Sequence, residues 1–236
     1  MPQNCLQGQL NDNLEAAIDS FFREKFTEYL REDMRNHPDY VRLSSFIKIK
    51  HGFAFDGDYF SETPTVLVLV SPGNFKIGGG FQNIKPKYYA ENAPYSQDFV
   101  LTATNLVVTM TDLSKNGDTL GFSAVIPHSN TLTFLHNQRI GLIEFISEDL
   151  PPSFVYLLMR SDNYRNYILA TASGTTVRHT SPSRITDYGF LMPSNKDELD
   201  ILDNLFATYI SNSNQYHSEF DLLAEVQATL MSRLAT

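Results

Sequence analysis

The stretch from residue 199 to residue 234 places the strongest constraint on how this chain folds. Counted in alternating steps of three and four, it has eleven seam positions, and nine of them are apolar. The positions are Leu199, Leu202, Phe206, Tyr209, Ser213, Tyr216, Phe220, Leu223, Gln227, Leu230 and Leu234. Apolar residues that recur every 3.5 residues form a coiled-coil seam, which needs a facing helix to fill its holes. The sequence therefore predicts a long C-terminal helix that packs against another helix.

A matching apolar stripe with helical spacing lies near the other end of the chain. It consists of Leu14, Ile18, Phe22 and Phe26. Capping residues at 11–13 and a breaker at 37–39 bound a helix that is expected to begin at Leu14 and to run to about Arg35. We predict that the two end helices form a coiled coil. Pairing within a chain, pairing between chains and packing of each helix on its own domain are all compatible with the pattern.

Between these helices the pattern changes to short β-like runs separated by turn residues. Strands are expected within 41–49, 65–70, 105–110, 121–126, 141–145 and 188–191, and small helices within 153–160 and 161–172. This order predicts an α+β domain with a curved mixed or antiparallel sheet. We divide the chain into an N-terminal spacer helix (1–36), a middle domain (37–194) and a C-terminal spacer helix (195–236).

The cysteine content and the N-terminal sequence favour a cytoplasmic protein. Cys5 is the only cysteine of the 236 residues, which excludes an internal disulfide and a cysteine-based zinc site. The first residues lack a basic and apolar signal sequence, and no apolar run approaches the roughly 18 residues of a membrane span.

The net charge of −9 does not exclude a nucleic-acid partner, because the acidic residues are concentrated in the end helices. Residues 46–193 carry eleven basic and twelve acidic side chains, and residues 194–236 carry two and seven. A nearly neutral middle domain can present a local basic face.

The densest basic and aromatic cluster lies in a segment flanked by Gly and Pro residues. Its members are Lys76, Lys85, Lys87, Tyr88 and Tyr89. Cations of this kind replace counterions along DNA phosphates. We predict that the cluster binds DNA; the alternative is a solvated loop whose tyrosines face the core.

A second predicted DNA-binding cluster begins within the break at 173–176 and continues after it. It consists of Thr175, Thr176, Arg178, His179 and Arg184. Hydroxyl groups, backbone N–H groups and guanidinium groups all bind phosphate oxygens. A purely structural turn is the alternative for 173–176.

Two further segments carry side chains that are suited to DNA. Lys48 and Lys50 share one face of a strand, although a solvated strand edge explains them equally well. Asn137, Gln138 and Arg139 have the side-chain types that bind adenine and guanine edges. The alternative for Arg139 is an internal ion pair.

Catalytic patterns are weaker. No third ligand at metal spacing follows His51, Asp56 and Asp58, and the glycines at 78–80 are not followed by the Lys of a phosphate loop. The sequence predicts no catalytic residue, no metal and no cofactor.

Several segments, taken in this order and spacing, resemble a half-length DNA specificity (S) subunit of a type I restriction-modification system. They are Val41-Arg42-Leu43-Ser44-Ser45-Phe46, Gly52-Phe53-Ala54-Phe55, Asp98-Phe99-Val100-Leu101, Leu106-Val107-Val108-Thr109-Met110-Thr111, Leu135-His136-Asn137-Gln138-Arg139-Ile140-Gly141, Ala172-Ser173-Gly174-Thr175-Thr176-Val177, Arg184-Ile185 and Leu191-Met192-Pro193. The family often opens the long helix with Pro-Pro and Glu-Gln pairs, and this chain departs from that pattern at 192–199. A full S subunit has two recognition domains, whereas this chain has one.

The resemblance implies a function for each part of the chain. Residues 37–194 would be a target recognition domain that reads one half of a split site in double-stranded DNA, and the helices would be spacers. The implied partners are modification (methyltransferase) subunits and a second copy or another half-subunit, with a restriction subunit as an open further candidate. Two alternatives are a coiled-coil interaction adaptor that does not read DNA and an enzyme without a recognisable motif.

Overall fold

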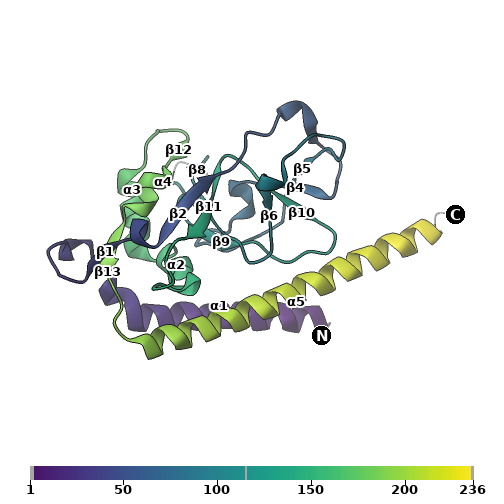
Figure 1. Ribbon diagram of the computed structural model, residues 1–236. Helices are drawn as coiled ribbons and strands as arrows, with labels where there is room; N and C mark the ends of the chain where they lie inside the picture. The colour runs from purple at the N-terminus through teal and green to yellow at the C-terminus, as the bar shows by residue number, and fades with distance from the viewer. Residues whose placement is uncertain (1–2, 115, 235–236) are drawn as a thin grey trace.

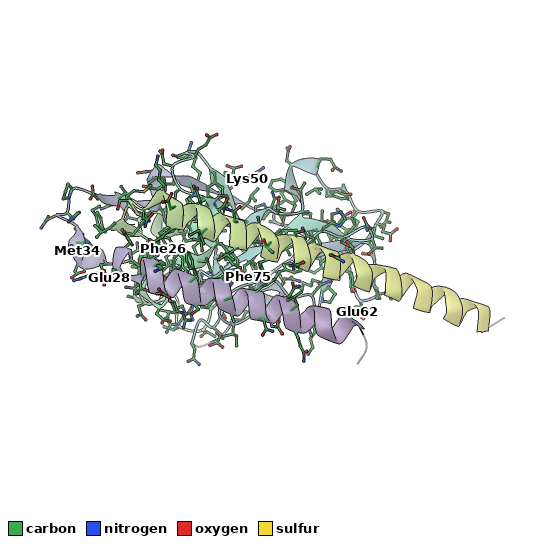
Figure 2. All side chains as sticks on the ribbon, turned by 90° about the horizontal axis from the view of Figure 1, so that it is seen from below. Phe26, Glu28, Met34, Lys50, Glu62 and Phe75 are labelled. Atoms are coloured by element: carbon green, nitrogen blue, oxygen red, sulfur yellow. The ribbon has the colours of Figure 1, made fainter. Side chains whose placement is uncertain are left out.

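Two long helices lie side by side along one face of a mixed α/β domain (Figure 1). The computed structural model describes residues 3–114 and 116–234. The first helix, α1 (Gln3–Phe26), and the last helix, α5 (Lys196–Leu234), run in opposite directions. Figure 2, seen from below, shows the pair across the face of the domain and shows α5 extending beyond the start of α1.

Within the described residues, the middle of the chain forms four sheets instead of one curved sheet. The largest has the order β3-β5-β4-β10-β6, in which β4 and β10 are parallel and the other pairs are antiparallel. An antiparallel sheet has the order β2-β11-β7-β9, and β1-β13 and β8-β12 form two small sheets. The strands are β1 (Tyr40–Arg42), β2 (Ile47–His51), β3 (Phe60–Ser61), β4 (Leu67–Val70), β5 (Lys87–Tyr89), β6 (Val100–Leu101), β7 (Leu106–Thr109), β8 (Thr111–Asp112), β9 (Ser123–Val125), β10 (Thr133–His136), β11 (Ile140–Phe145), β12 (Arg178–His179) and β13 (Gly189–Leu191).

Three short helices complete the domain: α2 (Pro152–Leu158), α3 (Asp162–Thr171) and α4 (Pro182–Thr186). Helix α2 starts with a proline at its first helical position, where the missing N–H has no intrahelical partner in any case. Residues 153–158 of α2 are all buried. This helix therefore forms the centre of the main core.

Both end helices pack their apolar stripes into this core. Ile18, Phe22 and Phe26 of α1 are at most 3% exposed, and the Phe22 and Phe26 rings each lie 5.4 Å from the ring of Phe154 in α2. On α5, Leu202 is fully buried and the Phe206 ring lies 5.0 Å from that of Tyr156 in α2.

The predicted interface residues of α1 and of the first half of α5 therefore contact their own chain. Leu14 and Tyr209 are partly buried, and Tyr209 packs against the main core. Because the domain and the two helices bury these stripes together, the stripes are not free to pair with a second copy. The side chains of the remaining predicted interface residues lie outside the described part of the chain: Tyr216, Phe220, Leu223, Leu230 and Leu234.

Helix α1 spans different residues from the helix predicted from the sequence. It begins at Gln3 instead of Leu14 and ends at Phe26, well before Arg35. The chain then forms two 3₁₀ turns, and the carbonyl oxygen of Leu30 accepts hydrogen bonds of 3.0 Å from Asn163 and Tyr188. Side chains of the domain thus donate hydrogen bonds to a carbonyl oxygen that would accept a backbone N–H if the helix continued.

A buried ionic cluster fastens α1 to the domain. The Arg160 side chain, 10% exposed, lies 2.9 Å from Glu15 and 3.2 Å from Asp19 of α1. It also donates to the carbonyl oxygen of Gly78 (3.0 Å) and to the hydroxyl of Tyr156 (2.6 Å). Burial opposes the charge on Arg160, but the nearby Tyr156, Asp19 and Glu15 together raise its pKa. Arg160 therefore stays charged at every working pH.

We predict that Arg160→Met destabilises the protein by about 3 kcal/mol, because it leaves two acidic groups without their buried cation. Unfolding in urea, followed by circular dichroism, measures this loss. The control is Arg42→Met, which removes the ion pair between Arg42 and Asp187; both side chains are more than half exposed. Such a pair contributes less than about 1 kcal/mol. Equal losses in the two variants would contradict a structural role for the cluster.

Candidate nucleic-acid interface

The two largest sheets meet at the turn between β10 and β11. Strand β10 of the five-stranded sheet ends at His136, and β11 of the four-stranded sheet begins at Ile140. Within the turn, the Ile140 N–H donates to the Asn137 carbonyl oxygen (3.0 Å), and the Arg139 N–H donates to the Asn137 side-chain oxygen (3.2 Å). These bonds leave the exposed Gln138 and Arg139 side chains pointing away from the core.

The loop after β2 runs beside this turn. The Phe53 N–H donates to the His136 carbonyl oxygen (2.8 Å), and the Phe53 carbonyl oxygen accepts from the Gln138 N–H (2.9 Å). At Gly52 an added Cβ would lie 2.2 Å from the Asn137 carbonyl oxygen, so only glycine permits this approach. The loop and the turn therefore form one rigid unit.

A third segment, from the C-terminal part of the domain, lies near this loop and this turn. Strand β12 pairs with β8, and Thr111 Oγ1 lies 3.1 Å from His179 Nδ1. Ser173 and His179 exchange two backbone hydrogen bonds (2.8 and 2.9 Å), which close a turn that carries the exposed Thr175 and Thr176. Strands β8 and β12 lie on the side of the domain away from α1 and α5 (Figure 1).

Together these three segments line an open depression of about 530 Å³, which we call the sheet-junction depression. Its lining residues are His51, Gly52, Phe53, Ala54, Thr111, Gln138, Arg139 and His179. Hydrogen-bonding and cationic side chains surround one large apolar side chain, Phe53. An amide and a guanidinium group are the side chains that bind purine edges with two hydrogen bonds.

A buried histidine supports the depression from below. His136 is 1% exposed, and its Nε2 lies 2.8 Å from the Ile140 carbonyl oxygen. Burial lowers the pKa of His136 to about 4, so the ring is neutral at pH 7 and its Nε2–H donates to that carbonyl. This bond closes the base of the turn.

An acidic side chain fixes the loop after β8. Asp112, 4% exposed, accepts hydrogen bonds from the N–H of Ser114 (2.6 Å) and from the N–H and hydroxyl of Thr119. Burial raises its pKa, but these hydrogen bonds outweigh burial, and the pKa of Asp112 is below its ordinary value. Asp112 is thus a structural anion beside the depression.

The first predicted DNA-binding cluster does not assemble into one surface. Tyr89 is 2% exposed and belongs to the core, so it is not available to DNA, and Tyr88 packs partly buried against core residues. Lys76 lies 3.7 Å from Glu15 of α1. Lys85 and Lys87 are exposed, and the Lys87 amino group lies 4.7 Å from the centre of the Phe60 ring. The alternative of core-facing tyrosines is correct for Tyr89.

The second predicted cluster is largely held together. Arg178 and His179 form β12, and Thr175 and Thr176 lie on the turn before it. Arg184 is exposed on α4, outside the depression. Of these five residues, His179 lines the sheet-junction depression.

The sequence predicted some of the residues that line the depression and missed others. Arg139 is exposed, which contradicts the alternative of an internal ion pair. His51 and Phe53 were not among the predicted contacts, although Phe53 belongs to one of the segments that resemble the S family. Lys48 is exposed, whereas the amino group of Lys50 donates to the Asp98 carbonyl oxygen (3.1 Å) and lies 5.6 Å from the centre of the Phe99 ring.

Metal-binding clusters and membrane-spanning helices are both absent from the described residues. Among them, no three side chains of the types His, Cys, Asp and Glu gather closely enough to hold a metal ion. None of the helices in this part of the chain combines the length and apolarity needed to cross a bilayer.

Three solved structures are similar to this chain. The HsdS subunit from Thermoanaerobacter tengcongensis aligns with 88% of this chain and 46% of its own, at 12% identity and a TM-score of 0.47. The type I restriction-modification system S subunit from M. genitalium aligns with 77% of this chain and 41% of its own, at 16% identity and a TM-score of 0.46. A chain from a structure of the type I R-M system, described in terms of complex assembly and conformational transition, aligns with 95% of this chain and 51% of its own, at 14% identity and a TM-score of 0.49.

The chain spans about half the length of these solved chains. No protein-family model matches the chain, and no curated protein matches it at a significant level.

We predict that His136 makes the stability of the domain depend on pH. The folded-state pKa is about 4 and the ordinary value is 6.5, so the unfolded chain binds the proton first as the pH falls. The stabilising contribution is complete above pH 6.5 and decreases as the pH falls toward 4. At pH 5 the loss is about 2 kcal/mol.

Urea unfolding at pH 7 and at pH 5 tests this expectation. The control is His136→Gln, whose amide N–H₂ can donate to the same carbonyl group but does not titrate. The variant should lose about 2 kcal/mol less than the wild type between the two pH values. Identical pH dependence of the two proteins would show that His136 is not the titrating group.

Proposed function

We propose that this chain is a half-length DNA specificity subunit of a type I restriction-modification system, and that it has no catalytic activity, cofactor or metal of its own. The observation that carries the proposal is the meeting of three segments at the sheet-junction depression. Each overlaps a stretch that resembles the S family in sequence: 52–55, 135–141, and 106–111 with 172–177. Together they place Gln138, Arg139 and His179 around one open surface. The domain at 37–194 would read one half of a split site in double-stranded DNA.

The chemistry of the depression suits the major groove. Gln138 and Arg139 are exposed at the tip of a turn whose backbone is fixed by hydrogen bonds. A rigid tip loses little conformational freedom on binding. Gln binds the N6 and N7 groups of adenine, and Arg binds the O6 and N7 groups of guanine. The neighbouring Arg178, Thr175 and Thr176 are suited to backbone phosphates.

The helices have a different part in this proposal. Residues 194–236 carry two basic and seven acidic side chains, so this part of the chain is unsuited to DNA phosphates and suited to protein partners. Helix α5 has 39 residues and therefore a length of about 58 Å, more than the roughly 34–36 Å helical repeat of DNA. We propose that the helices form a coiled-coil spacer and a docking surface for modification subunits in the cytoplasm, with a restriction subunit as an open further partner.

The seam of α5 beyond α1 is the proposed contact with a second copy or another half-subunit. Apolar seam residues continue along this part of the sequence, from Phe220 to Leu234. An isolated half would read one half-site, and two copies would read both halves at a spacing that the helices fix.

The DNA-reading role predicts that Gln138→Ala and Arg139→Ala each lower the affinity for the cognate half-site by about tenfold to a hundredfold. Binding should be measured by gel shift in the presence of the modification subunits, against random competitor DNA and at several salt concentrations. Arg31→Ala, which removes an exposed guanidinium group from the turns after α1, is the matched control and should leave binding unchanged. Absent or salt-insensitive binding by the wild type would instead favour the interaction adaptor.

The spacer role predicts a dimer in solution that depends on the seam of α5. Leu223→Asp combined with Leu230→Asp should convert it to a monomer, because a buried unpaired charge disrupts an apolar seam. Light scattering measures the molar mass. Ala207→Asp adds the same charge at an exposed position outside the seam and should leave the dimer intact. A wild-type monomer in the presence and absence of DNA would contradict this role.

A further inference from the structure

A large apolar side chain is exposed among the residues that line the sheet-junction depression. Phe53 has 46% of its surface exposed, although five of the eight residues that line the depression are polar or charged. The exposed part of the ring is adjacent to the groups that we propose to read DNA. The exposed part of the Phe53 ring is therefore placed to contact an apolar group of a DNA target.

The Phe53 ring is held in place from behind. It packs edge-on against Phe55, with ring centres 5.3 Å apart and planes at 83°, and it is tilted against Phe99 at 5.1 Å. Its backbone is fixed by hydrogen bonds to His136 and Gln138. The exposed part of the ring is thus a preorganised apolar surface, which needs little ordering on binding.

The shape of the site indicates what this surface can receive. An intercalating wedge must project between base pairs, whereas Phe53 lines a concave surface and rests on two other rings. A concave apolar floor receives a group that projects from its target. In the major groove of unmodified DNA, the apolar group on the base edges is the C5-methyl group of thymine.

We propose that Phe53 is a specificity-determining residue that contacts the C5-methyl group of one thymine in the half-site. Gln138, on the rim of the same depression, reads the N6 and N7 groups of an adenine in the same or the adjoining base pair. This inference rests on the proposed function, because it requires the depression to face the major groove. It extends that function by naming the chemical group that the apolar floor recognises.

Replacement of single thymines by deoxyuridine tests the inference directly. The half-site is first selected from random duplexes by the complex of this chain with its modification subunits. Each thymine is then replaced by deoxyuridine, which removes the methyl group and leaves base pairing unchanged. The wild-type complex should lose about fourfold in affinity at one thymine position, the value for one buried methyl group. Fluorescence anisotropy resolves a change of this size.

Variants of Phe53 assign this loss to the ring. Phe53→Ala should bind the thymine and deoxyuridine sites equally, because the apolar floor is absent. Phe53→Leu keeps an apolar side chain and should retain part of the discrimination. A change in folding alone would weaken binding to both sites alike and would leave the ratio of the two affinities unchanged.

The outcomes separate the inference from the proposed function. Three outcomes would overturn the role of Phe53 and leave the DNA-reading role in place. They are sequence-specific binding with no loss at any deoxyuridine, a selected half-site without thymine, and full discrimination by Phe53→Ala. If Phe53→Ala does not fold, Phe53→Leu makes the assignment, and discrimination by Phe53→Leu equal to that of the wild type would overturn the role of the ring. Absence of sequence-specific binding would overturn the proposed function and this inference together.

Discussion

The burial of helix α2 is the constraint on which the rest of the structure depends. Its residues 153–158 are covered on all sides, and both end helices take part in covering them. The ring of Phe154 contacts aromatic rings from both α1 and β13. Because α2 loses this cover if either end helix is displaced, the helices are structural parts of the domain. The Arg160 cluster adds a polar contact that fixes the position of α1.

The structure was most predictable where apolar residues recur at helical spacing. The stripes at Ile18, Phe22 and Leu202 indicated two helices with buried faces, and these three side chains are buried in the structure. The pattern did not decide between the possible partners, because a seam specifies apolar contact and not its source. In the structure each end helix contacts both the other end helix and the domain of the same chain. Turn residues marked the loops but not the sheets that they join, since β pairing between distant strands depends on tertiary packing.

The candidate site was predictable only in part, for a physical reason. Lys76 and Tyr89 form a dense basic and aromatic cluster in the sequence, yet one lies near an acid on α1 and the other fills the core. The sheet-junction depression instead combines residues near 52, 138 and 179, which come together only through the crossing of two sheets. Local composition carries no information on such contacts. The segments that resemble the S family include Gly52 and Gln138, and one of them, 172–177, ends just before His179.

In the turn from 136 to 140, the residues that fix the backbone are different from the residues that expose their side chains. Gly52 and Asn137 are fixed by steric and hydrogen-bonding requirements, whereas the side chains of Gln138 and Arg139 project into solvent and hold no described part of the core together. Substitutions at these two positions are therefore nearly free of cost in folding stability. If the proposed function holds, a lineage of such proteins could acquire a new target preference by point mutation at the tip, with no change in the residues that fix the turn.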